Sequence, residues 1–186
     1  QAQYASDMTQ GRHKAFGGYG GIRFQAPYYP KSRPYLEVSY WTLSGDDGVA
    51  LKTNGRMSAN EDFISFENVN HSLILESSEI GLDIDSNYSA FKIQGGVTLW
   101  SKVDFSVFVG VFTLNEEPNL ALLPAGVTSV SDKLGTEVNV RLTWRPSETV
   151  RLALGFASLS GGTFFEDMQR ADDSAIAGSF AASVLF

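Results

Sequence analysis

The last eleven residues of this chain place the narrowest limits on its fold. They read Ile-Ala-Gly-Ser-Phe-Ala-Ala-Ser-Val-Leu-Phe and run from Ile176 to Phe186. Small or polar residues alternate with apolar ones, and successive side chains of a strand point to opposite sides. The larger apolar residues Phe180, Val184 and Phe186 therefore share one face. The last residues of soluble domains are more commonly polar, frayed tails, so this segment predicts a terminal strand with one apolar face.

The composition favours strands over helices. The 186 residues include 18 Gly, 13 Phe, 7 Tyr and 3 Trp, a mixture that suits twisted strands joined by tight turns. No segment approaches the ~20 apolar residues of a membrane helix, whereas a membrane-spanning strand needs only ~9–11 residues with one apolar face. The net charge of −7 argues against nucleic acid as a partner. The absence of Cys excludes disulfides and thiolate metal sites.

Alternation with a period of two recurs along the chain, and it predicts an all-β protein. Between Val103 and Val111 every second residue is Val or Phe, and the residues between them include Asp104, Ser106 and Gly110. We expect eight antiparallel strands, at residues 16–26, 34–44, 73–85, 88–100, 103–114, 136–145, 149–160 and 176–186.

Two stretches fit this scheme less well. The connection 45–72 is long, although the eight-strand count places it at the end of the barrel where turns should be short. It contains two short apolar runs that would form an extra hairpin, and ten strands is therefore the alternative. The strand 73–85 changes phase around Glu76, which we interpret as a bulge.

Alternation does not by itself decide which face points outward, because a soluble lipocalin-like barrel hides its apolar face inside. Three features favour apolar side chains on the outside. Gly96, Gly110 and Gly155 share the polar face with long charged residues, as the crowded interior of a narrow barrel requires. Tight turns alternate with long connections. Trp144 lies on the apolar face beside a tight turn, where an interfacial aromatic girdle would be.

The segment 176–186 resembles the terminal strand of Gram-negative outer-membrane β-barrel proteins. The resemblance implies an antiparallel up-and-down transmembrane β-barrel in the bacterial outer membrane, closed by this strand. It further implies that Phe180, Val184 and Phe186 belong to a signal that the barrel-assembly machinery reads. Outer-membrane lipid and lipopolysaccharide would surround the barrel, and another envelope protein is a candidate partner. We interpret residues 1–15 as a periplasmic segment and residues 16–186 as one barrel domain.

The polar faces of the strands predict a network of charges inside the barrel. Five basic residues stand against five acidic ones, and buried charges have to pair because an unpaired one costs several kcal/mol. Such a network fills a narrow lumen and argues against a wide channel. Its predicted members are Arg23, Glu37, Lys92, Asp104, Glu137, Arg141, Arg145 and Arg151, with Glu79 and Asp83 as less secure additions.

The sequence does not predict catalysis, a metal or a cofactor. The lipid A-modifying enzymes among outer-membrane barrels use His and Ser with a carboxylate, but His13 and His71 lie outside the predicted strands. The run Asp83-Ile-Asp85-Ser-Asn87 starts like a calcium loop but lacks its glycine and its final Glu, so a strand end is the better interpretation.

Two predicted outer loops carry apolar residues: Leu122 and Leu123 in one, Phe164 and Phe165 in the other. They either fold over the mouth of the barrel or contact a partner. We therefore expect a non-enzymatic barrel that acts as a structural, anchoring or partner-binding component of the cell envelope. The alternatives are a narrow, porin-like pore for small solutes, a lipid A-modifying enzyme and a soluble lipocalin-like binder.

Overall fold

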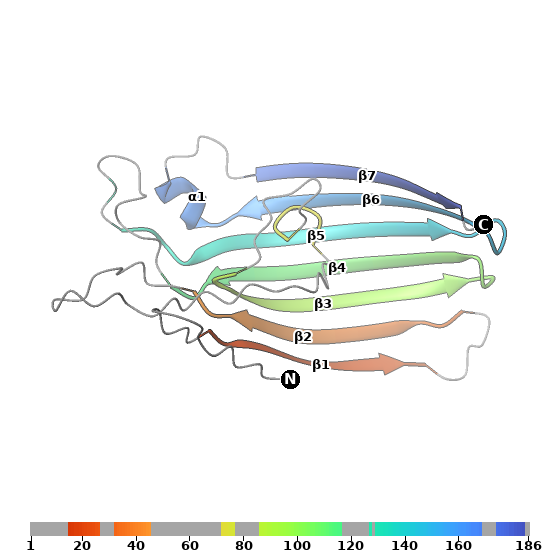
Figure 1. Cartoon of the computed structure of the whole chain (residues 1–186), viewed down its shortest axis with the longest axis horizontal. Helices are drawn as coiled ribbons and strands as arrows, with labels where there is room; N and C mark the ends of the chain where they lie inside the picture. The colour runs from red at the N-terminus through yellow and green to blue at the C-terminus, as the bar shows by residue number, and fades with distance from the viewer. Residues whose placement is uncertain are drawn as a thin grey trace, which may run out of the picture.

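Seven strands form one antiparallel sheet in which every strand pairs with its neighbours along the chain (Figure 1). This computed structural model describes residues 15–26, 32–45, 72–76, 86–116, 127, 129–168 and 174–184. The strands are β1 (Gly17–Gln25), β2 (Tyr35–Leu43), β3 (Tyr88–Leu99), β4 (Val103–Leu114), β5 (Lys133–Trp144), β6 (Val150–Gly161) and β7 (Ser174–Val184). One short helix, α1 (Thr163–Asp167), follows β6. The antiparallel up-and-down, all-β prediction is confirmed.

The predicted count of eight strands is wrong for the described sheet, because no strand lies between β2 and β3. These two strands pair directly, from Leu43 opposite Tyr88 to Tyr35 opposite Gly96, and the other edge of β2 pairs with β1. Residues 72–76 form a bend where the sequence predicted the start of a strand, and residues 77–85 lie outside the described part. The extra hairpin considered within the connection 45–72 also lies outside the described part, because only residues 45 and 72 of this connection are described.

Removing that strand changes which connections share an end of the sheet. The long connections β2–β3, β4–β5 and β6–β7 all lie at one end, which we call the long-connection end. The tight turns β3–β4 and β5–β6 lie at the other, which we call the tight-turn end, together with the β1–β2 connection (Figure 1). The length of 45–72 is therefore no longer an exception. With seven strands, β1 starts at the long-connection end and β7 ends at the tight-turn end, whereas an even count would bring both to one end.

The alternation predicted along the strands gives the sheet two chemically different faces. We call the face that carries Lys92, Phe108 and Glu137 the inner face, because its central residues are buried. The opposite, outer face carries apolar side chains that are half-buried or exposed, with an exposed fraction of up to 73% at Ile176. Apart from Lys133, at the first position of β5, the outer face of the described strands holds no Asp, Glu, Lys or Arg.

Strands β1 and β7 are the two edges of the described sheet. The buried apolar core lies on the inner face toward the long-connection end. Its largest members on the strands are Leu43, Tyr88, Phe108, Phe112, Leu134 and Leu159. Among the described residues, Ser72–Glu76, from the chain between β2 and β3, cover this core on the inner face.

The turn between β3 and β4 holds two residues in a left-handed backbone conformation. Trp100 has φ 49° and Ser101 has φ 59°, and the Lys102 N–H donates to the Leu99 carbonyl at 3.1 Å. Two central residues with positive φ are typical of a two-residue hairpin turn, which usually selects Asn-Gly. The turn thus begins one residue earlier than the sequence predicted, and it carries two side chains that this backbone disfavours.

We expect Ser101→Gly to raise the free energy of unfolding by about 1 kcal/mol, because glycine adopts positive φ without the clash at Cβ. Urea unfolding followed by tryptophan fluorescence measures the change. Ser160→Gly, at an ordinary position of β6, is the matched control and should lower stability by about 0.5–1 kcal/mol. Equal losses in both variants would contradict the strain assigned to Ser101.

Candidate functional site

The segment Ser72–Glu76 lies against the inner face, and all five of its residues are buried. We call these five residues the plug. Glu137 on β5, which is fully buried (0% exposed), holds the plug by its backbone. The Leu73 and Ile74 N–H groups donate to Glu137 Oε1 at 2.7 and 3.0 Å. The Leu75 N–H and the Ser72 hydroxyl donate to Oε2 at 2.9 and 2.6 Å.

This arrangement solves the problem of placing a carboxylate away from water. A buried charge is costly unless it is fully hydrogen-bonded, and bonds to an ionised acceptor are stronger than neutral ones. Four donors on two oxygens supply that compensation to Glu137. The Ser72 hydroxyl oxygen also accepts the Leu75 and Glu76 N–H groups at 3.0 and 3.1 Å, which closes the plug into a compact turn.

A second anchor joins the other end of the plug to β3. Lys92 and Glu76, both almost completely buried, form an ion pair. The Tyr88 hydroxyl donates to the same Glu76 oxygen at 2.6 Å. The Lys92 ammonium also lies 5.0 Å from the ring centre of Trp41 and 5.6 Å from that of Phe112, within the range of cation–π attraction.

Gly110 on β4 makes room between the two anchors. The register places it opposite Lys92 on one side and Glu137 on the other. A Cβ at this position would lie 2.6 Å from the Phe112 ring and 2.7 Å from the Phe108 ring, so the two rings close over the glycine. A larger residue would push these rings away from the core, which is the role that the sequence assigned to small residues on the polar face.

The plug also supplies apolar side chains to the core. Leu73, Ile74 and Leu75 belong to the same buried cluster as Phe108 and Phe112. At the long-connection end the inner face is therefore filled by aromatic rings, leucines and two buried ionic anchors.

The predicted charge network is divided into separate pairs. Arg23 lies 3.7 Å from Glu37, and Arg145 lies 2.6 Å from Asp104, which also accepts the Thr98 hydroxyl at 2.8 Å. Lys92 pairs with Glu76, and Glu137 binds backbone amides in place of an arginine. Arg141 and Arg151 lie on the inner face near the tight turns and are exposed. Glu79 and Asp83 lie outside the described residues.

Sequence reasoning did not identify Glu76 and Ser72 as parts of this site. The change of phase around Glu76 was the available signal, and we interpreted it as a bulge within a strand. The structure places this residue in a turn whose partners lie on β3 and β5. Nothing in the local pattern names those partners, because they come together only when the sheet forms.

Other predicted site residues lie apart from the plug. Phe180 and Val184 are exposed on the outer face of β7, and Phe186 lies outside the described residues. Phe164 and Phe165 belong to α1 and pack against the core. Their rings meet edge to face, with 5.3 Å between the ring centres. Leu122, Leu123, His13 and His71 lie outside the described part of the chain.

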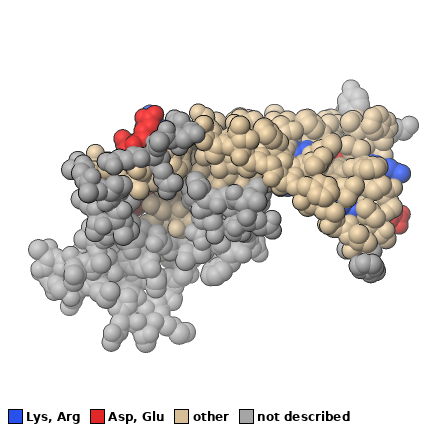
Figure 2. Space-filling model, turned by 90° about the horizontal axis from the view of Figure 1, so that it is seen from above, with Lys and Arg blue, Asp and Glu red and all other residues tan. Residues whose placement is uncertain are grey.

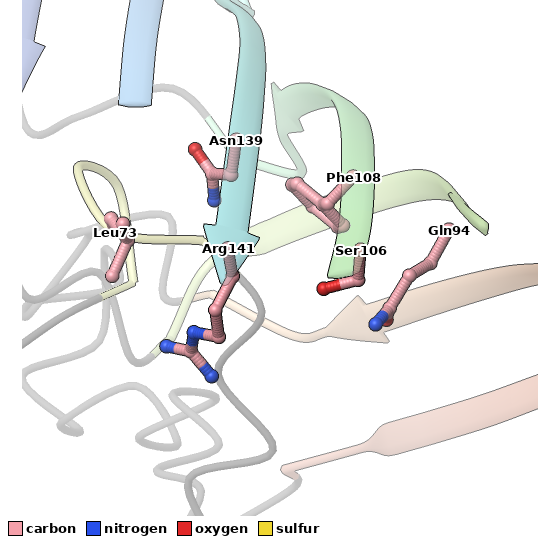
Figure 3. Close-up of a pocket in the computed structure, with 6 residues that line it drawn as sticks. All are labelled: Leu73, Gln94, Ser106, Phe108, Asn139 and Arg141. Carbon is pink, nitrogen blue, oxygen red and sulfur yellow. The ribbon is translucent and has the colours of Figure 1, made fainter. Parts of the chain in front are cut away.

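Beside the plug, toward the tight turns, the inner face contains a small cavity of about 20 Å³, enough for one water molecule. Figure 3 shows the six side chains that line it, which come from the plug and from β3, β4 and β5. They are Leu73, Gln94, Ser106, Phe108, Asn139 and Arg141. The cavity marks the boundary between the filled half of the inner face and the half with the exposed arginines.

Comparison with protein-family models gave no match, and comparison with curated proteins gave none either. Within the described residues, no group of His, Cys, Asp and Glu side chains is arranged to hold a metal ion. The same residues include no helix with the length and apolar character needed to cross a membrane. The inner-face site is therefore defined by its own geometry.

We expect Glu137→Gln to lower the free energy of unfolding by about 3–5 kcal/mol, because glutamine replaces one carboxylate oxygen by an NH₂ group and leaves two of the four buried donors without an acceptor. The glutamine NH₂ would also face the plug's N–H groups. Urea unfolding measures the loss, with Glu148→Gln in the exposed β5–β6 turn as the matched control, expected to change stability by less than about 0.5 kcal/mol. Similar small effects in both variants would contradict the role given to Glu137.

Proposed function

We propose that this chain forms a closed, non-enzymatic β-barrel in the bacterial outer membrane and serves as a structural, anchoring or partner-binding component of the envelope. The observation that carries the proposal is the outer face, where large apolar side chains of all seven strands are exposed. In water such a surface would be far larger than the apolar patches that soluble monomers tolerate. Acyl chains would cover it at no cost.

The height of the apolar surface agrees with this proposal. On β4 the outer face is apolar from Val103 to Val111, which is about 27 Å of strand at 3.4 Å per residue. A strand tilted by roughly 40° would span about 21 Å with this length, close to the ~25 Å apolar band of outer-membrane barrels. Uncharged residues dominate the long surface seen in Figure 2.

The borders of the band also fit a membrane. Toward the long-connection end the outer face becomes polar at Thr42, Ser89 and Thr113, which lie side by side on three neighbouring strands. Toward the tight-turn end, Trp100 and Trp144 are exposed, as expected for an aromatic belt at the level of the lipid head groups.

Closure of the barrel is part of the proposal. In hydrocarbon, the free edges of β1 and β7 would leave rows of N–H and C=O groups unpaired, at several kcal/mol each. The edges must therefore be joined, either to each other or through a further segment of chain. In the orientation usual for this class, the tight turns face the periplasm and the long connections face outward.

The plug favours the structural role over the alternative of a narrow pore. Solutes crossing the barrel would have to pass the half of the inner face that the plug fills, where Glu137 and Lys92 both hold it. A closed lumen agrees better with an anchor or a binding component than with conduction. The remaining candidate functions, a lipid A-modifying enzyme and a soluble binder, gain no support from this geometry.

We expect Val140→Arg to weaken folding into phosphatidylcholine vesicles by about 2–4 kcal/mol, because Val140 lies at the middle of the proposed band. Urea titration of the vesicle-inserted protein measures the change. Ser160→Arg, on the outer face near the polar border, is the matched control with an expected cost below about 1 kcal/mol. If the chain stays out of vesicles, or if both variants behave alike, the membrane proposal fails.

Planar bilayers distinguish the closed barrel from the pore. We expect the purified protein to give no stepwise ion currents, because the docked plug fills the inner face. The variant Glu137→Gln weakens one anchor and provides the comparison under identical conditions. Reproducible conductance steps from the unaltered protein would overturn the structural role in favour of the pore.

A further inference from the structure

Toward the tight turns the inner face has a second half, which the plug reaches only at its border, where Leu73 lies close to Gly155. From the level of Ser106 to the tight turns, β6 and β7 present mainly small side chains inward, including Ala153, Gly155, Ser179 and Ala181. The residues opposite them on β5 are Arg141 and Thr143. We call this half of the inner face, which extends from the level of Ser106 on β4 to the level of Arg151 on β6, the vestibule. Beside these short side chains, Arg141 and Arg151 are exposed.

The vestibule carries an excess of positive charge. On its strands and at the residue after β5 stand Arg141, Arg145 and Arg151, against one acid, Asp104. Asp104 is already paired with Arg145 at 2.6 Å. Within the part of the chain that the structure describes, neither Arg141 nor Arg151 forms an ion pair. Figure 2 shows blue side chains gathered toward this end of the molecule.

The groups around Arg141 suit an oxyanion. Ser106, directly opposite on β4, offers a hydroxyl, and Gln94 and Asn139 line the same small cavity (Figure 3). A guanidinium presents a planar fork of N–H donors that matches carboxylate or phosphate oxygens in pairs. The cavity itself holds only one water molecule, and no carboxylate of a described residue lines it, so an anion bound beside it at Arg141 would meet no competing acid there.

We propose that the vestibule binds a doubly charged oxyanion, a phosphate or a dicarboxylate, between Arg141 and Arg151. The inference rests on the proposed membrane barrel, because hydrocarbon around the wall makes two uncompensated guanidinium groups costly and a bound counter-anion favourable. The anion enters from the tight-turn end, since the plug closes the other end. The charge of the site matches a dianion: three arginines against one aspartate give a net of two positive charges.

Calorimetric titration of the chain in uncharged detergent, at neutral pH and constant ionic strength, tests the site with inorganic phosphate and with succinate. We expect saturable binding of at least one of them. Arg141→Gln and Arg151→Gln should each weaken it about tenfold, the effect of losing one charge-assisted contact. Arg141→Lys keeps the charge without the planar fork and should bind with intermediate strength. Lys133→Gln, a cation at the opposite end of β5, is the matched control and should leave binding unchanged.

The outcomes separate the two ligand classes and the two proposals. Binding of phosphate alone, of succinate alone or of both supports the vestibule and names its ligand. The inference is overturned by the absence of saturable binding, or by binding that survives in the Arg141→Gln/Arg151→Gln double variant with a native circular dichroism spectrum. A chain that enters vesicles but binds neither anion loses the vestibule and keeps the barrel. A chain that binds phosphate but stays out of vesicles loses the barrel.

Discussion

The described structure depends on one buried carboxylate. Glu137 stands in the middle of the sheet, on the face that has to be filled, and a charge there is tolerable only if several donors converge on it. The plug supplies them with three backbone N–H groups and the Ser72 hydroxyl. The same contacts satisfy the buried carboxylate of the sheet and fix this part of the connection between β2 and β3. Once the turn is held, its leucines complete the core and Glu76 neutralises Lys92. The two anchors lie on β5 and β3, with β4 between them, so docking of five residues ties three strands into a fixed arrangement.

The outer face differs from the inner face in chemistry. Its side chains are almost all apolar, whereas the inner face is built from specific hydrogen bonds and ion pairs. The apolar side chains of the outer face make no recognisable site and leave the surrounding medium to cover them. In the membrane that we propose for this chain, hydrocarbon would cover this surface, and it would also increase the cost of every charge left unpaired behind it. The division of the sheet into an apolar outer face and an inner face with a filled half and a cationic half then follows from one constraint. Each charged residue inside has to find a partner in the wall, in the plug or in solution.

Much of this architecture could be predicted from the sequence, since a period of two fixes which residues share a face. Leu36, Val38 and Tyr40 oppose Glu37 and Ser39 in the structure as the pattern indicated, and β6 is equally regular. The prediction was wrong at Leu73–Leu75, which form a buried turn and not a strand. Three apolar residues in a row fit either structure. The prediction also could not identify the Glu76–Lys92 pair or the backbone contacts of Glu137. Partners 16 and more than 60 positions apart are set by the register of the sheet and by the path of the connection.

The position of Glu137 also has a consequence for how the strands find their alignment. Because side chains alternate, sliding β5 by one residue would turn Glu137 outward and bring Val138 to the inside. The carboxylate would then lie among the apolar side chains of the outer face, and the plug would lose its acceptor in the same step. A misaligned hairpin is thus penalised on both faces at once, which gives the β4–β5–β6 segment a built-in check on its own assembly.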